Sequence, residues 1–170
     1  MDGALAIIFA IVGLTDMAFN ECPTGCLARS EDTSRFSIQA AGVQFNTDWL
    51  GSEVVFGYDY GHSFGPFQPT ISISATEQGD IWFGGGAKWR QEIGRSDFFF
   101  EGSFQPGVYI RGDGPDLGGA IHFRSALGLG YEFDNGGSIL MSFDHRSNGD
   151  LLPTNPGLET LAIQYSIALD

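Results

Sequence analysis

Large apolar side chains alternate with small or polar ones along most of the sequence after residue 34. Successive side chains of a β-strand point to opposite faces of its sheet, so this period of two residues predicts strands. Near the C-terminus, Leu161, Ile163 and Tyr165 fall on one face, while Ala162 and Gln164 fall on the other. The composition agrees, because glycine accounts for 25 of 170 residues and lysine, a common helix former, occurs once. The sequence therefore predicts an all-β protein.

Eight segments carry this alternation, and turn-forming residues separate them. Asp-Asn-Gly-Gly at 134–137 is a strong hairpin signal, because Asn-Gly tolerates the positive φ angles of a tight turn. Most segments have about 8–11 residues, which is the length of a tilted strand that crosses an outer membrane. We therefore predict an eight-stranded antiparallel up-and-down β-barrel. The predicted strands are 35–45, 53–62, 67–75, 80–89, 97–104, 120–133, 137–146 and 159–169.

The two faces of these strands differ in a way that bears on the environment of the barrel. Large side chains fill the interior of a soluble barrel, whereas in an outer-membrane barrel they face lipid and the narrow lumen takes small and polar residues. The polar face here is rich in small residues, which favours the membrane barrel over a soluble lipocalin-like binder of an apolar ligand. The side chains predicted to face lipid include Ile139, Met141, Phe143, Leu161, Ile163 and Tyr165. Inside the barrel we expect Arg124 or Lys88 to pair with Glu132, Glu101 or Asp59.

The first 34 residues differ from the rest and are predicted to form a leader or an N-terminal tail, with the barrel domain at 35–170. The apolar run 4–14 has the length of the centre of a secretory signal, although Asp2 stands where a basic residue is usual. No apolar run reaches the about 18 residues that a membrane-spanning helix needs.

Cysteines, charge and loop motifs limit the remaining function classes. Cys22 and Cys26 predict a small disulfide loop, in keeping with an exported protein, unless they are removed with a leader. The net charge of −13 argues against a nucleic-acid partner, since a phosphate backbone would be repelled. The sequence has no glycine-rich phosphate loop and no cluster with metal-ligand spacing, so neither a cofactor nor a metal is predicted.

Three polar residues stand at positions where the alternation expects apolar ones. His145 and Ser147 share the face of Met141 and Phe143, and Glu159 lies on the apolar face of the following strand. Polar groups on a lipid-facing surface are unfavourable without partners. Together, a Ser nucleophile, a His base and an orienting carboxylate form a catalytic triad for acyl transfer. The alternative is that His145 and Ser147 lie in a solvated loop of a non-catalytic barrel.

The segment around these residues resembles a known family. The element His-x-Ser-Asn at 145–148, the Asn-Pro-Gly at 155–157 and the carboxylate of Glu159, 14 residues after His145, are similar to the lipid A 3-O-deacylases of the PagL type, also called acyloxyacyl hydrolases. The resemblance covers residue 97 onward well and the earlier strands by pattern only. It implies an eight-stranded barrel in the bacterial outer membrane, with the active site on the outer wall at the depth of the outer leaflet.

The resemblance also implies a role for each matching residue. Ser147 would attack the ester carbonyl of a 3-O-linked hydroxyacyl chain on lipid A, His145 would transfer the proton, and Glu159 would orient His145. The N–H groups of Asn148 and Gly149 are candidates for the oxyanion hole. The implied partners are lipopolysaccharide and outer-membrane lipid. A homodimer is compatible with the sequence, which does not fix the oligomeric state. The alternatives are an adhesive or structural barrel without catalysis and the soluble lipocalin-like binder.

Overall fold

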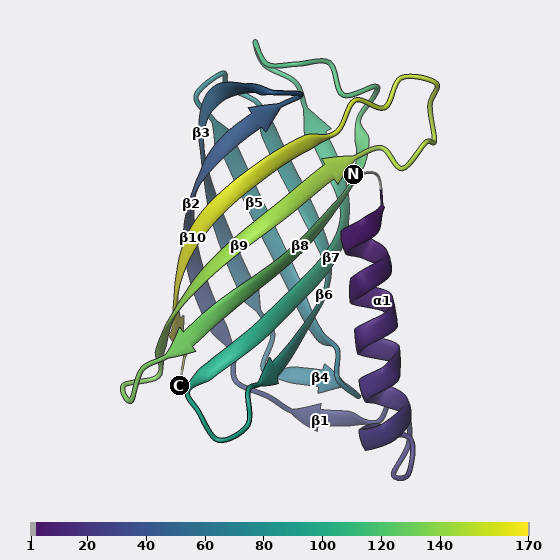
Figure 1. Cartoon of the computed structure of the whole chain (residues 1–170), viewed down its shortest axis with the longest axis vertical. Coiled ribbons are helices and arrows are strands. Elements are labelled where there is room, and N and C mark those ends of the chain that lie inside the picture. The colour runs from purple at the N-terminus through teal and green to yellow at the C-terminus, as the bar shows by residue number, and fades with distance from the viewer. Residues whose placement is uncertain (1–2, 170) are drawn as a thin grey trace.

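Eight antiparallel strands form a closed barrel in the computed structural model, which describes residues 3–169 (Figure 1). The order around the barrel is β10-β2-β3-β5-β6-β7-β8-β9, so neighbours in the sequence are neighbours in space and β10 closes onto β2. The predicted up-and-down barrel of eight strands is therefore confirmed. The barrel strands are β2 (Arg35–Phe45), β3 (Asp48–Asp59), β5 (Gln68–Thr76), β6 (Ile81–Glu92), β7 (Phe98–Ile110), β8 (Ile121–Glu132), β9 (Gly137–Ser147) and β10 (Leu158–Ala168).

Some strand boundaries differ from those predicted. β7 continues to Ile110, whereas the predicted strand ends at residue 104, before Pro106 and Gly107, which are common turn residues. In the structure Pro106 and Gly107 pair with β8. Two three-residue strands, β1 (Arg29–Glu31) and β4 (His62–Phe64), form a separate ladder that the sequence does not predict, because three residues are too short to show alternation.

Apolar side chains cover the outside of the barrel, as the alternation predicts. Met141 of β9 is 60% exposed and Ile163 of β10 is 58% exposed. Ser142 and Thr160, which occupy alternate positions on the same two strands, are buried. Of the six residues predicted to face lipid, five are exposed and Phe143 is half-buried. An apolar exterior around a polar interior is the arrangement of a membrane barrel and the reverse of a soluble cup.

Ion pairs fill the lumen. Lys88 bridges Asp59 and Glu101, with both N–O distances at 3.0 Å, as predicted. The prediction for Arg124 is wrong, because its guanidinium pairs with Asp144 at 2.6 Å. Asp144 lies on the neighbouring strand β9, opposite residue 126, so it is a diagonal neighbour on the same inner face. Glu132 lies eight residues further along β8, at the other end of the barrel, where Arg35 pairs with it.

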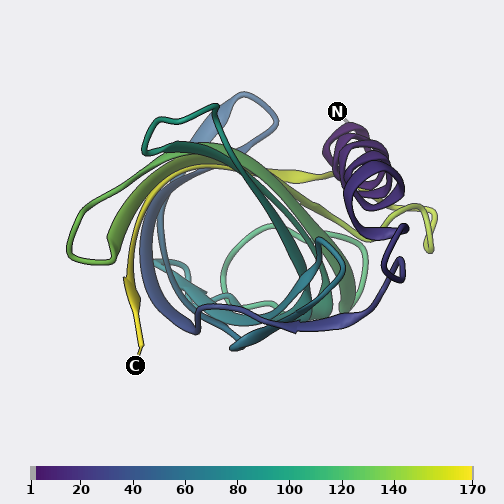
Figure 2. The ribbon, with the colours of Figure 1, turned by 90° about the horizontal axis from the view of Figure 1, so that it is seen from below.

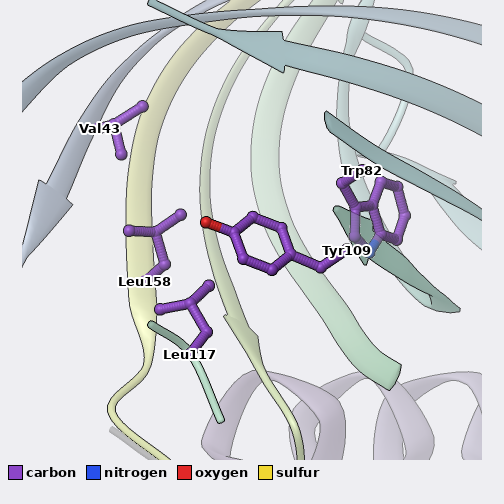
Figure 3. Packing of buried hydrophobic residues seen from close by; sticks show 5 residues of the cluster. All are labelled: Val43, Trp82, Tyr109, Leu117 and Leu158. Atoms are coloured by element: carbon purple, nitrogen blue, oxygen red, sulfur yellow. The ribbon is translucent and has the colours of Figure 1, made fainter. Parts of the chain in front are cut away.

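An apolar cluster fills the lumen beside the two long loops, 111–120 and 148–157. Figure 3 shows its five side chains, of which Tyr109 points across the lumen between Trp82 and the others. Four come from strands and one comes from loop 111–120. The cluster consists of Val43, Trp82, Tyr109, Leu117 and Leu158. In bacterial outer-membrane barrels the longer loops lie on the extracellular side, so this is the extracellular end.

A helix lies outside the barrel, along its wall (Figure 2). α1 (Ala4–Asp16) continues into the π-helical turn η1 (Met17–Glu21) and contacts β7 and β8. Phe9 of α1 stacks on Phe104, and the indole N–H of Trp89 donates to Asp16 at 2.7 Å. Because η1 extends the helix, residues 4–21 form an 18-residue helix with a mean hydropathy of 1.6, which is long and apolar enough to cross a membrane by length and composition. The uninterrupted apolar run within it still ends at Leu14. A signal sequence has the same properties.

A disulfide follows this helix. The structure joins Cys22 to Cys26, as predicted, in the turn between η1 and β1.

Candidate active site

His145 and Glu159 form a pair on the outer wall of the barrel. They are direct partners in the β9–β10 register, and Nδ1 of His145 lies 3.1 Å from Oε1 of Glu159. His145 is only 2% exposed, although it occupies a lipid-facing position, and the side chain of Glu159 is 20% exposed. A carboxylate at this distance accepts a hydrogen bond from Nδ1–H and so holds the tautomer in which Nε2 is free to accept a proton.

Ser147 is the last residue of β9 and projects from the same outer face as His145. Both line a cavity with a volume of about 310 Å³. Nε2 of His145 is buried and has no hydrogen-bond partner within residues 3–169, Ser147 included. The structure therefore brings a serine hydroxyl and an unpartnered imidazole nitrogen to one cavity without joining them directly.

Three kinds of wall enclose this cavity. Phe104 of β7 and Phe123 of β8 form an apolar side, and Phe123 is the direct cross-strand partner of Ser147. The loop 148–157 contributes the polar side, from Gly149, Asp150 and Asn155. The N-terminal end of α1 borders the third side through Gly3 and Ala6. An apolar wall next to a few polar groups is typical of a small-molecule binding site.

Ser125 is a further hydroxyl of this site that the sequence analysis missed. It lies on β8 as the direct partner of His145, is buried, and lines the same cavity. The signal that identified His145 also applies here, because Ser125 is a polar residue on the face of Phe123 and Leu127.

Gly157 lies directly against the imidazole ring of His145, where any Cβ atom would overlap Cε1. The loop that ends in Gly157 leads into β10, and so it covers His145 on its way to Glu159. This contact explains in part why His145 is buried on an otherwise exposed face.

The two residues predicted to supply oxyanion donors differ in the structure. The backbone N–H of Asn148 donates to Oδ1 of Asn155 at 2.9 Å, so that N–H is engaged. The Asn148 side chain donates to the carbonyls of Gly118 and Thr154, at 2.9 and 2.6 Å, and thereby joins the two long loops. Gly149 has a left-handed φ of 62° and lines the cavity. Its N–H takes part in no hydrogen bond among the described residues.

Acidic residues, histidines and cysteines are scattered over the molecule. Within residues 3–169, no three of these side chains come together in a group suited to a metal ion.

Solved structures with the same fold are membrane barrels. The crystal structure of the outer membrane enzyme PagL is similar with a TM-score of 0.67 and 19% identity, and the match covers 79% of this chain and 99% of that one. A de novo designed transmembrane β-barrel matches with a TM-score of 0.59 at 11% identity, over 82% and 98% of the two chains. The N-terminal β-barrel domain of Pseudomonas aeruginosa OprF matches at 0.56 and 13% identity, over 81% and 100%. At these identities the likeness shows the fold.

A family model shows the relationship at the level of sequence. The lipid A 3-O-deacylase (PagL) model matches residues 34–168, which include every strand of the barrel. A search among curated proteins finds no match to the chain. Since the family model covers most of the chain and the fold is that of outer-membrane barrels, this protein belongs to the PagL family of outer-membrane lipid A 3-O-deacylases.

Proposed function

We propose that this chain hydrolyses a 3-O-linked hydroxyacyl ester of lipid A, with Ser147 as nucleophile, His145 as general base and Glu159 as the orienting carboxylate. The observation that carries the proposal is the pair of His145 and Glu159, 3.1 Å apart on the lipid-facing wall, where Nε2 of His145 has no partner among the described residues and His145 and Ser147 line one cavity. A buried His paired with a partly exposed Glu among exposed apolar side chains has little structural use, because the corresponding positions further along β9 and β10 carry Met141 and Ile163.

The chemistry follows from these positions. Oγ of Ser147 attacks the ester carbonyl while Nε2 of His145 takes its proton, and Glu159 stabilises the imidazolium that forms. The tetrahedral intermediate collapses when His145 returns the proton to the sugar oxygen, which leaves as a hydroxyl. Water, activated by His145, then cleaves the acyl-enzyme and releases the hydroxy fatty acid. Oγ of Ser147 and Nε2 of His145 form no hydrogen bond in the structure, and such catalytic hydrogen bonds often tighten only when substrate binds.

The negative charge of the intermediate needs a donor near Ser147. We assign this role to the backbone N–H of Gly149. Gly149 borders the cavity, and its N–H makes no hydrogen bond among the described residues. The N–H of Asn148 joins it only when it releases Asn155, its present partner.

The place of the site on the barrel fits a lipid substrate. The cavity lies at the end of β9 beside the long loops, hence at the level of the outer leaflet, where the acyl chains of lipid A lie. Phe104 and Phe123 would contact the acyl chain. We propose that residues 1–34 are a leader or a tail, and removal of α1 would open the side of the cavity that Gly3 and Ala6 now border.

The test compares two serines of the same cavity. Purified wild-type protein, Ser147→Ala and Ser125→Ala are incubated with lipid A in detergent micelles, and released hydroxy fatty acid is measured by mass spectrometry. We expect release by the wild type and by Ser125→Ala and none by Ser147→Ala, with heat-modifiable gel mobility showing that all three are folded. Loss in Ser125→Ala with retention in Ser147→Ala would move the nucleophile to Ser125. No release by the folded wild type would contradict the esterase function.

A further inference from the structure

The residues that alternate with the three reactive positions all point into the lumen, and each is fixed there. Asp144 precedes His145, Arg146 separates His145 from Ser147, and Thr160 follows Glu159 in the chain. All three are 1% exposed. Successive side chains of a strand point to opposite faces. Each of the three outward-facing residues therefore has a neighbour in the chain whose side chain faces the lumen.

Two linked sets of contacts hold these inner side chains. Asp144 accepts from Arg124 at 2.6 Å and from the hydroxyl of Thr160, and these contacts join β8, β9 and β10 just beneath the site. Arg146 pairs with Glu53 of β3 at 2.7 Å. The strands β10 and β2 lie between β9 and β3, so this ion pair crosses the lumen.

Further contacts fix both ends of the ion pair that crosses the lumen. The guanidinium of Arg146 lies over the ring of Trp82, 5.2 Å from its centroid, and the carboxylate of Glu53 also accepts from the hydroxyl of Ser74. Trp82 itself belongs to the apolar cluster of Figure 3. The position of Arg146 is therefore determined by β3, β5 and β6, on the far side of the barrel from Ser147.

We propose that Arg146 and Glu53 are positioning residues for the reaction, and that their ion pair fixes the relative placement of His145 and Ser147. Ser147 ends β9, and the loop of ten residues that follows has no strand partner of its own. Strand ends open more readily than strand centres, since fewer contacts hold them. An anchor one residue before the end of β9 keeps Ser147 in the extended geometry that places its hydroxyl on the face of His145. The inference rests on the proposed esterase function.

The experiment measures kcat and KM separately for variants of this ion pair, in the full chain in detergent micelles. Arg146→Met and Glu53→Gln remove it, while Arg146→Lys keeps the charge. Lys88→Met is the matched control, because Lys88 is also buried and is doubly paired, but with Asp59 and Glu101 in another part of the lumen. The rate at which a serine-directed phosphonate labels Ser147 gives a second readout that needs no lipid substrate.

We expect Arg146→Met and Glu53→Gln to lower kcat and the labelling rate at least tenfold with little change in KM, Arg146→Lys to recover part of the loss, and Lys88→Met to keep both rates near those of the wild type. The inference is overturned if folded Arg146→Met and Glu53→Gln retain wild-type kcat, or if Lys88→Met loses as much. These outcomes differ from failure of the esterase function itself. In that case the wild type would neither release hydroxy fatty acid nor react with the phosphonate, and both proposals would fall.

Discussion

Gly157 packs against the imidazole of His145 without any space for a side chain between them. The backbone at 157 thus covers the ring of His145, and it does so two residues before Glu159, the hydrogen-bond partner of the same imidazole. The end of the loop and the start of strand β10 therefore both contact His145. A glycine is required here by close approach, since its φ is not among the positive values of this chain.

The first prediction follows from this contact. Gly157→Ala should displace the imidazole from Glu159 and lower the rate of deacylation by at least tenfold, because a Cβ atom overlaps the ring. Release of hydroxy fatty acid measures the effect. Gly136→Ala is a suitable control, since Gly136 lies at the opposite end of the barrel with a φ of 78°. It should cost about 1 kcal/mol of stability through backbone strain and leave the rate unchanged. Equal activity of the two variants would contradict the role of Gly157.

The second prediction concerns Asn148, whose side chain joins the two long loops. Asn148→Ala removes the hydrogen bonds to Gly118 and Thr154, each worth about 1 kcal/mol, and leaves both carbonyls without this donor. We expect both loops to become sensitive to protease in the folded barrel and the deacylation rate to fall. Limited proteolysis followed by mass spectrometry locates the cuts. Unchanged resistance of both loops would show that other contacts hold them.

A third prediction compares two leucines of β10 on opposite faces. Leu158 is buried in the lumen cluster, whereas Leu161 is 53% exposed on the outer wall. Leu158→Ala leaves a cavity beside Tyr109 and Leu117 and should cost about 3 kcal/mol. Leu161→Ala leaves no cavity and should cost clearly less. Urea unfolding in detergent, followed by tryptophan fluorescence, gives both values, and a larger loss for Leu161→Ala would argue against the assignment of inner and outer faces.

The fourth prediction concerns the disulfide. Cys22→Ser combined with Cys26→Ser should leave deacylation unchanged. The bond closes a loop of only a few residues, and Cys22 follows Gly3, which borders the cavity, by 19 positions, about 28 Å along a helix. The measurement is the rate of acyl release before and after reduction of the wild type, beside the double variant. Loss of activity in a fully inserted double variant would show that the cysteines contribute to the site.

Alternation alone was sufficient to predict the barrel and its two faces, because a membrane barrel imposes opposite chemistry on its inside and outside. The same argument placed His145 and Glu159 on one face. It could not give their register, which depends on how the loop 148–157 folds. Ser125 is likewise a polar residue on the apolar face of its strand. The sequence analysis did not single it out, because no nearby residue in the sequence indicates a partner for a lone serine.

The ion pairs inside the lumen were predictable only in part. Lys88 pairs with Asp59 and Glu101, which are two of the three predicted carboxylates. Arg124 pairs instead with Asp144, whose position near it follows from the β8–β9 register. The sequence pattern also did not predict that α1 contacts the outer wall of the barrel. Apolar helices pack without a periodic signature when all their faces are apolar.

The lumen of this barrel is closed by ion pairs and by the apolar cluster around Trp82, and the groups proposed to react lie on the outer surface. A lipid therefore reaches them by lateral movement within the bilayer plane and never through water. The encounter rate follows the mole fraction of substrate in the membrane or micelle, as in surface-dilution kinetics. Inert detergent added at constant total lipid A will slow the reaction without inhibiting the protein.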